Sequence, residues 1–270
     1  MSMLNKTKSG LASLVNSLNV QIPRYLENLN CGVCLSSNSL RKHSTYPSLD
    51  VNETVLYICT SCTSIYNSTT ESTKITNAVA QVEWLEKENF YIVPTERQNF
   101  ESLVDEAANI FRWFSEKFDY EFSNKTFFEI GAGSGISSVA ASRYFFKCVT
   151  TDLTLERLQM AKKMSNSENL TVISTTEVDG IKFDFFFAWH VFEHLINPGQ
   201  VFEDAFTKLN QGGVMFMQVP LVTERHIYPG HIFMHNEFSW SKILSKFEVR
   251  EKYFFYDTAL CAMTIVVFKK

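Results

Sequence analysis

The chain has 270 residues and a net charge of −4, and 45% of its residues are hydrophobic and 20% charged. This length is enough for one large domain with its own core and a small additional module, and the balanced composition excludes a disordered or fibrous protein. Because the sequence has neither a run of about 18 apolar residues nor a stripe of basic residues, we expect no transmembrane helix, and nucleic acid is a disfavoured partner.

Residues 1–30 are a polar leader. They contain no long apolar core followed by a small-residue cleavage site, so the sequence predicts no signal peptide and a cytoplasmic protein. Residues 11–26 have the pattern of a weak amphipathic helix that packs on the protein's own surface. None of these features indicates an oligomeric state.

Two pairs of cysteines follow the leader. Cys31 and Cys34 form one C-x-x-C pair, Cys59 and Cys62 form a second, and 24 residues separate the pairs. Two such pairs supply the four thiolates of a tetrahedral zinc site, which leaves no open position and is therefore structural. The sequence thus predicts a zinc-binding ribbon over residues 31–70, followed by a linker or helix over 71–96. The alternative is two redox-active or incidental thiol pairs.

From residue 97 the pattern alternates between helices and strands, which is typical of a parallel sheet covered on both faces. A run of apolar residues at 183–189 indicates a strand buried on both faces. The expected helices are Asn99–Phe118, Ile136–Tyr144, 155–164, one from Pro198 to Gly212–Gly213, and Glu237–Phe247. The expected strands are Thr126–Ile130, Lys147–Thr151, Leu170–Ser174, Phe183–Trp189, Val214–Val219, Glu248–Tyr256 and Cys261–Phe268.

A glycine-rich loop joins the first of these strands to a helix. Glycines at 131, 133 and 135 allow a ligand to approach the backbone closely, and Asp152 ends the next strand 21 residues after Gly131. A carboxylate in that place can accept hydrogen bonds from both hydroxyls of a ribose. The G-x-G-x-G spacing differs from the G-x-G-x-x-G of dinucleotide sites, which disfavours an NAD enzyme. The plainer interpretation is a tight turn and a helix-capping aspartate.

Four segments together resemble the class I S-adenosylmethionine-dependent methyltransferases: EIGAGSG, TTDLT, FDFFFAWHVFEHLINPG and LNQGGVMFMQVP, which span residues 97–268 with their flanks. The resemblance is greatest to a bacterial branch whose members read WHVLEH near the fourth strand. It implies a Rossmann-like seven-stranded sheet with helices on both faces in domain 97–270, preceded by the zinc ribbon. Gln211 departs from the family, which usually has proline there.

The resemblance also implies which residues hold the cofactor, S-adenosylmethionine. Glu129 and the glycine loop would line its amino-acid half, Asp152 would hold the ribose, residues 174–177 would flank the adenine, and 188–190 would lie beside the sulfonium. The candidate cofactor-binding residues are therefore Glu129, Gly131, Ala132, Gly133, Gly135, Asp152, Leu153, Thr175, Ala188, Trp189 and His190.

The segment WHVFEH ends the fourth strand, where the transferred methyl group would lie. Three interpretations stay open: His194 shapes the loop, His190 or His194 is a general base, or His190, Glu193 and His194 bind a divalent metal with His231 or His235. The residues 224–235 follow the fifth strand, where related enzymes place a loop over the substrate, and His231 is the favoured substrate-side residue. The candidate catalytic residues are His194, His190 and His231.

These features predict methyl transfer to a small polar acceptor, such as a nucleotide-linked sugar, a polysaccharide sugar or a natural-product intermediate. Two alternatives remain. A zinc ribbon could read RNA for a base methyltransferase, against which the acidic balance argues. A methyltransferase fold could also serve as a non-catalytic scaffold, against which the intact glycine loop and Asp152 argue.

Overall fold

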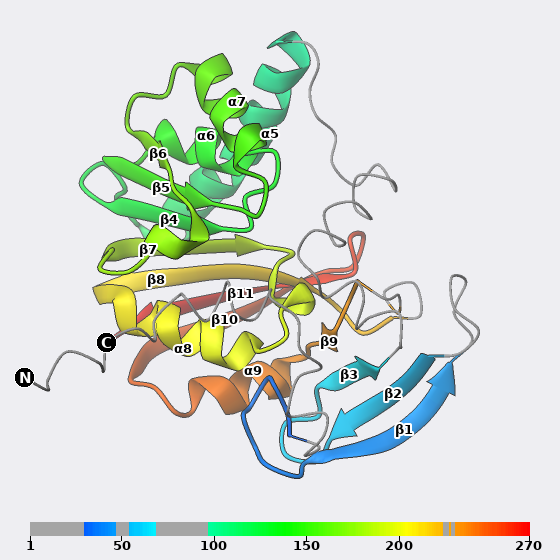
Figure 1. Cartoon of the computed structure of the whole chain (residues 1–270). Helices are drawn as coiled ribbons and strands as arrows, with labels where there is room; N and C mark the ends of the chain where they lie inside the picture. Colours follow the sequence, from blue (N-terminus) through cyan, green and yellow to red (C-terminus); the bar gives the residue numbers. More distant parts are fainter. Residues whose placement is uncertain (1–29, 47–53, 69–96, 224–226, 228–229) are drawn as a thin grey trace, which may run out of the picture.

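The computed structural model describes residues 30–46, 54–68, 97–223, 227 and 230–270, and Figure 1 shows two sheets in this part of the chain. The predicted leader helix at 11–26, the predicted linker at 71–96 and His226 lie outside the described residues. Within the described ranges, no helix combines the length and hydropathy that crossing a bilayer requires.

The larger sheet has seven strands in the order β10-β11-β8-β7-β4-β5-β6. The five strands from β8 to β6 run parallel, while β11 is antiparallel to β8 and β10 is antiparallel to β11. The bounds are β4 (Thr126–Ile130), β5 (Lys147–Thr151), β6 (Leu170–Val172), β7 (Phe183–Trp189), β8 (Leu209–Pro220), β10 (Val249–Asp257) and β11 (Ala262–Lys269). The predicted Rossmann-like sheet with seven strands is confirmed.

Helices cover both faces of this sheet (Figure 1). On one face lie α5 (Arg97–Phe118), α6 (Ile136–Ser142) and α7 (Leu155–Ser165), and on the other lie α8 (Pro198–Lys208) and α9 (Glu237–Leu244). Strand β7 is central and takes part in both cores, because Phe183 and Phe186 pack on one side while Phe185 and Phe187 pack on the other. A continuous apolar run is what such a strand requires.

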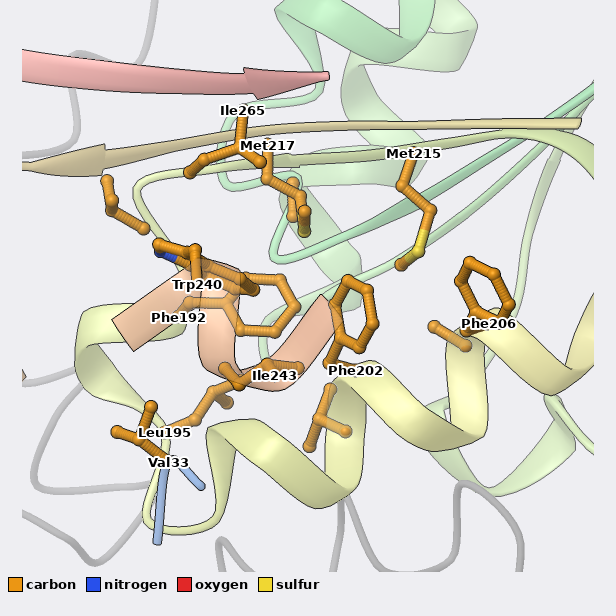
Figure 2. Close-up of a cluster of buried hydrophobic side chains, with 14 of the residues drawn as sticks. Val33, Phe192, Leu195, Phe202, Phe206, Met215, Met217, Trp240, Ile243 and Ile265 are labelled. Atoms are coloured by element: carbon orange, nitrogen blue, oxygen red, sulfur yellow. The ribbon is translucent and has the colours of Figure 1, made fainter. Parts of the chain in front are cut away.

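Each core is rich in aromatic side chains. Under α5, Phe114 makes an edge-on contact with Phe185 at 5.1 Å between ring centroids. Under α8 and α9, Phe192 and Phe202 make edge-on contacts with Trp240, and Figure 2 shows these rings gathered between the helices and the methionines of β8. Edge-on aromatic pairs add stability beyond their buried area, so much of the phenylalanine in this chain serves the core.

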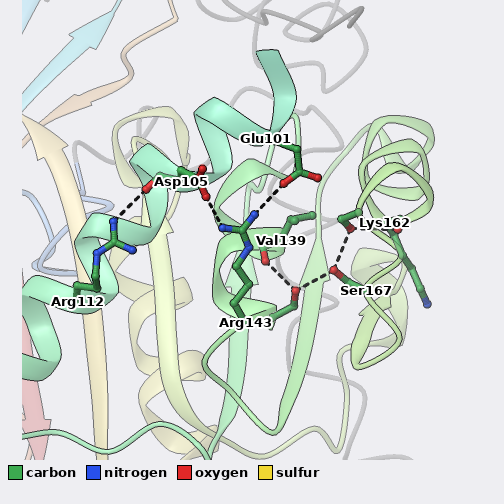
Figure 3. A network of polar contacts seen from close by, with 9 residues as sticks. Glu101, Asp105, Arg112, Val139, Arg143, Lys162 and Ser167 are labelled. Carbon is green, nitrogen blue, oxygen red and sulfur yellow. Dashed lines mark hydrogen bonds and ion pairs between the residues drawn. The ribbon is translucent and has the colours of Figure 1, made fainter. Parts of the chain in front are cut away.

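Helix α5 is tied to the end of α6 by Arg143 (Figure 3). The guanidinium of Arg143 lies 2.9 Å from Glu101 Oε2 and 2.5 Å from Asp105 Oδ1. All three groups are partly exposed, so the ion pairs contribute little stability in water. They join the N-terminal half of α5 to the end of α6.

The predicted end of α8 is wrong. The helix ends at Lys208, and Leu209 already has extended backbone. Gly212 and Gly213 do not close the helix but lie inside β8, where four residues (210–213) stand opposite Asp184 alone in the pairing with β7. The glycines therefore form a bulge, which a glycine with a φ of +70° at position 212 can adopt without strain. Several other predicted elements end two or three residues later than the observed ones.

The smaller sheet has the order β1-β2-β3-β9, all antiparallel. Its strands are β1 (Leu40–Tyr46), β2 (Thr54–Cys59), β3 (Ile65–Ser68) and β9 (Phe233–Met234). The fourth strand thus comes from the far end of the chain, from the segment between β8 and α9. The sequence did not predict β9 or its pairing.

The cysteine segment and the large domain share one core. Val33 is fully buried in the cluster that holds Phe192 and Trp240 (Figure 2), and the Lys246 ammonium donates to the Cys34 carbonyl at 2.7 Å. Gly199 N donates to Gly32 O at 3.0 Å, and a Cβ on Gly199 would lie 2.0 Å from the Val33 carbonyl oxygen. Only glycine fits this approach, so the two parts pack backbone to backbone.

Candidate active site

A cavity of about 660 Å³ opens at the carboxyl ends of β4, β5 and β7. Open α/β sheets bind ligands at this edge, and the volume suits a small-molecule site. Its walls come from α5, the loop between β4 and α6, the end of β5, the turn at Thr175, and the segment after β7. The lining residues are Leu103, Glu106, Ala107, Ile110, Glu129, Ile130, Gly131, Ala132, Gly133, Ser134, Ile136, Ser137, Thr151, Asp152, Leu153, Thr175, Phe187, Trp189, His190, Val191, His194 and Leu195.

The glycine loop forms the floor on the β4 side. Gly131 has a φ of +64°, and a Cβ at this position would lie 2.5 Å from Val191 Cγ2. Both the backbone conformation and the approach of the β7 segment therefore require glycine here. The N–H of Gly133 donates to Asp152 Oδ2 at 2.8 Å, which ties the loop to the end of β5.

Asp152 is nearly buried and holds two backbone groups. Besides Gly133, the N–H of Thr154 donates to Oδ1 at 3.0 Å. Burial raises the pKa of Asp152, and these backbone hydrogen bonds oppose the rise. Each carboxylate oxygen has a second lone pair, so the group can still accept hydrogen bonds from a ligand in the cavity.

Glu129 is buried at the end of β4 and lines the same cavity. Ser137 Oγ donates to its Oε1 at 2.5 Å, and Ser138 Oγ donates to its Oε2. Burial raises the pKa of Glu129 to about 7, against the lowering effect of the two serines, and the charge of Asp152 adds to the rise. A cationic ligand group would stabilise the ionised form.

The structure brings nine of the eleven predicted cofactor residues to the cavity wall. Gly135 and Ala188 are not on it: Gly135 caps α6 and packs on α7, and Ala188 is buried within β7. The wall formed by α5 was not foreseen, because that helix precedes the first strand and carries no motif. Its Glu106 adds a third carboxylate to the wall, after Glu129 and Asp152.

His190 stands at the rim of the cavity with its side chain 38% exposed. Its φ is +54°, a strained value for this residue, and its N–H donates to Gln218 O at 3.0 Å. Nδ1 lies 3.1 Å from Glu193 Oε1. Burial lowers the pKa of His190, but the hydrogen bond and charge of Glu193 outweigh it, so the net pKa is raised.

His194 also lines the cavity, but its ring is held differently. Nδ1 lies 2.7 Å from the carbonyl oxygen of Gly230, and Nε2 lies 3.8 Å from Glu193 Oε1. His231 is buried outside the cavity wall, and its ring centroid lies 4.9 Å from that of His194. The three predicted catalytic histidines therefore gather around Glu193, and two of them reach the cavity.

Glu193 lies at the centre of this group of histidines. From the sequence it was predicted only as a possible metal ligand. Its carboxylate is fully buried, and burial alone would raise its pKa. The hydrogen bond from His190 and the neighbouring histidines outweigh burial and bring the pKa of Glu193 to about 2. Oε2 has no hydrogen-bond partner within the described part of the chain.

His235 is not part of this group. It is fully buried against Trp240, with Nε2 3.3 Å from Phe192 O, and burial lowers its pKa to about 4. Within the described part of the chain, His235 is therefore a core residue. The sequence had left it open as a metal ligand.

The four paired cysteines also meet. Their sulfur atoms all lie within 4.8 Å of one another, the Cys31–Cys62 distance is 3.8 Å, and the Cys34–Cys59 distance is 3.7 Å. Four ligands at the usual zinc–sulfur bond length of about 2.3 Å in a tetrahedron are separated by about 3.8 Å. All four residues are buried and none is in a disulfide, so this donor set fits a tetrahedral zinc ion.

The sequence of residues 99–250 matches the family described as a methyltransferase domain, which is more than half of the chain. The chain belongs to this family and is an S-adenosylmethionine-dependent methyltransferase. The class I methyltransferase fold expected from the sequence motifs is thereby confirmed. No curated relative matches the chain.

Three solved structures are similar in fold to this methyltransferase. A methyltransferase from Aquifex aeolicus has a TM-score of 0.51 at 13% identity, over 65% of this chain and 99% of that chain. YcgJ from Bacillus subtilis has a TM-score of 0.50 at 13% identity, over 62% of this chain and 99% of that chain. A putative O-methyltransferase from Nostoc punctiforme has a TM-score of 0.50 at 12% identity, over 62% of this chain and 56% of that chain. At such identities these likenesses concern the fold alone.

Proposed function

We propose that this methyltransferase acts on a small polar acceptor, such as a nucleotide-linked or polysaccharide sugar or a natural-product intermediate. The observation that carries the proposal is the His190–Glu193 pair at the rim of a cavity of about 660 Å³ that also holds Glu129 and Asp152. A nucleoside cofactor and one small molecule suit such a volume better than a polymer does.

Different residues of the cavity would bind different parts of the cofactor. Glu129 would bind the ammonium group of the cofactor, Asp152 would bind its ribose hydroxyls, and Thr175 and Leu153 would flank its base. Bound S-adenosylmethionine supplies an electrophilic methyl group on a sulfonium. Trp189 and His190 would lie beside it, because Trp189 ends β7 and His190 follows it at the cavity wall.

His190 is the best candidate for the general base. Glu193 holds Nδ1 as the protonated nitrogen, so Nε2 keeps a lone pair that can take the proton of an acceptor hydroxyl or amine. His194 is less suited, because both of its ring nitrogens face the protein: Nδ1 faces Gly230 O and Nε2 faces Glu193. His194 and His231 would instead support Glu193.

The proposal keeps residues 31–70 as a structural zinc ribbon on Cys31, Cys34, Cys59 and Cys62, and 97–270 as the methyltransferase domain. Support comes from the sulfur geometry and from the fully buried Val33 between the ribbon and the large domain. The same proposal includes membership of the bacterial branch with WHVLEH. It also includes a cytoplasmic location, where thiols stay reduced.

The test is methyl transfer from isotopically labelled S-adenosylmethionine to separate panels of nucleotide sugars, natural-product phenols and amines, and RNA fragments, read by mass spectrometry. We expect labelled product in a small-molecule panel. In His190→Gln the turnover number should fall by about 10²-fold or more, since general bases contribute that much. The control is His43→Gln, an exposed histidine on β1. Product only with RNA would support the base-methyltransferase alternative, and none in any panel would favour the scaffold.

Affinity for S-adenosylhomocysteine should fall as the pH is lowered from 8 to 6. In the free protein the pKa of Glu129 is raised to about 7, so the carboxyl group is mostly protonated below that pH and cannot pair with the cofactor ammonium. Since binding requires the ionised form, the apparent affinity should drop about tenfold over this range and level off above pH 8. Isothermal titration calorimetry measures it. Glu129→Gln should bind weakly at all pH values, and a wild-type affinity that does not change with pH would contradict the assignment.

A further inference from the structure

Glu193, His194 and His231 form a cluster whose ligand atoms, one from each residue, all lie within 4.8 Å of one another. Glu193 and His231 are buried, and the side chain of His194 is 20% exposed and reaches the cavity wall. Two imidazoles and one carboxylate are a donor set that suits divalent first-row transition metals.

The two oxygens of the buried Glu193 carboxylate differ in their partners among the described residues. His190 occupies Glu193 Oε1, while Oε2 is fully buried and has no partner in the described part of the chain. Leaving a charged buried oxygen without a hydrogen bond is costly. A cation bound at this position would remove that cost.

The ring of His194 is oriented as in a metal ligand. A backbone carbonyl oxygen only accepts hydrogen bonds, so the contact of Nδ1 with Gly230 O at 2.7 Å requires a proton on Nδ1. In the neutral ring, Nε2 then carries a lone pair and lies 3.8 Å from Oε1 of Glu193, the carboxylate oxygen that also faces His190 Nδ1. Two groups that both offer lone pairs repel each other unless a proton or a cation lies between them. Metal-binding histidines commonly donate their second nitrogen to a carbonyl in this way.

We infer that Glu193, His194 and His231 bind one divalent transition-metal ion, separate from the zinc of the cysteine cluster. Three protein ligands leave coordination positions open. Because His194 lies on the cavity wall, an open position would hold an acceptor oxygen and make its hydroxyl easier to deprotonate, with His190 taking the proton. This role rests on the proposed function, but metal binding itself does not.

The experiment is a titration of the zinc-replete full chain with Mn²⁺, followed by electron paramagnetic resonance without cofactor or acceptor. Mn²⁺ favours carboxylate and imidazole over the thiolates of the cysteine cluster, so it reports this site. We expect one saturable equivalent of Mn²⁺. Glu193→Gln and His194→Gln should each weaken Mn²⁺ binding at least tenfold. The control is Asp152→Asn, which removes a carboxylate on the same cavity wall but outside the cluster and should leave Mn²⁺ binding unchanged.

Two results would overturn the inference. One is the absence of saturable Mn²⁺ binding at millimolar concentration, which would mean that protonated histidines neutralise Glu193. The other is Mn²⁺ binding that survives both substitutions in folded protein. His194→Gln guards against a folding defect of Glu193→Gln, because His194 is the most exposed member of the cluster. Methyl transfer that continues in the presence of a chelator would remove the catalytic role while leaving the proposed function intact.

Discussion

Asp152→Ala is expected to weaken binding of S-adenosylhomocysteine about 10²-fold. The carboxylate lines the cavity directly after β5, and its two oxygens can bind both hydroxyls of a ribose while holding Gly133 and Thr154. Hydrogen bonds to a charged group contribute about 1.5–3 kcal/mol each, and every 1.4 kcal/mol is tenfold in affinity. Calorimetric titration of the full chain measures the change.

Two variants make this result specific. Asp152→Asn keeps one acceptor oxygen and the side-chain volume, so its loss of affinity should be intermediate. Asp179→Ala removes a half-exposed aspartate that pairs with Lys208 away from the cavity, and it should bind as the wild type does. Unchanged affinity in folded Asp152→Ala would mean that the ribose is held elsewhere.

Cys59→Ser is expected to lower the melting temperature of the whole chain by about 10 °C and to abolish stoichiometric zinc. Structural zinc supplies about 10 kcal/mol or more to small modules, and loss of one thiolate forfeits much of that. The effect should not stay local, because Cys59 and Val33 belong to the same core as Phe192 and Trp240. Differential scanning calorimetry and elemental analysis measure the two changes; for a domain of this size about 4 kcal/mol corresponds to such a shift.

Cys261→Ser is the matched control, since Cys261 lies outside the sulfur cluster and should alter neither zinc content nor melting temperature. A variant Gly199→Ala tests the contact between the two parts without touching a cysteine. Its Cβ would lie 2.0 Å from Val33 O, so the ribbon must shift while its four sulfurs remain. We expect a lower melting temperature with zinc retained. A wild-type melting temperature in both Cys59→Ser and Gly199→Ala would show that the ribbon does not stabilise the domain.

The effect of Cys59→Ser should extend from the cysteine cluster to the active site through main-chain hydrogen bonds. Strand β3 pairs with β9, and Asn67 N donates to Ile232 O at 2.9 Å. Ile232 N in turn donates to Glu193 O at 2.8 Å. The edge of the smaller sheet thus holds the segment that carries His231 against Glu193, so Cys59→Ser should impair methyl transfer even where the cofactor still binds.

The order of strands and helices, and the edge of the sheet at which the cavity opens, could be predicted from the sequence because their determinants are local. A glycine that must adopt a φ of +64°, a carboxylate that ends the next strand, and the apolar run of β7 each leave a pattern within a few residues. The end of α8 was misplaced because the same two glycines suit a helix end and a bulge, and only the pairing of β8 with β7 selects the bulge.

The tertiary structure alone decided the rest. Which histidine is suited to be the base depends on what faces each ring nitrogen, and those partners, Glu193 and Gly230, come from different segments. The cavity wall made by α5 and the pairing of β9 with the smaller sheet likewise join residues far apart in the chain. Sequence patterns record the local conformation and burial that each residue requires, whereas such contacts arise only when packing of the shared core brings distant segments together.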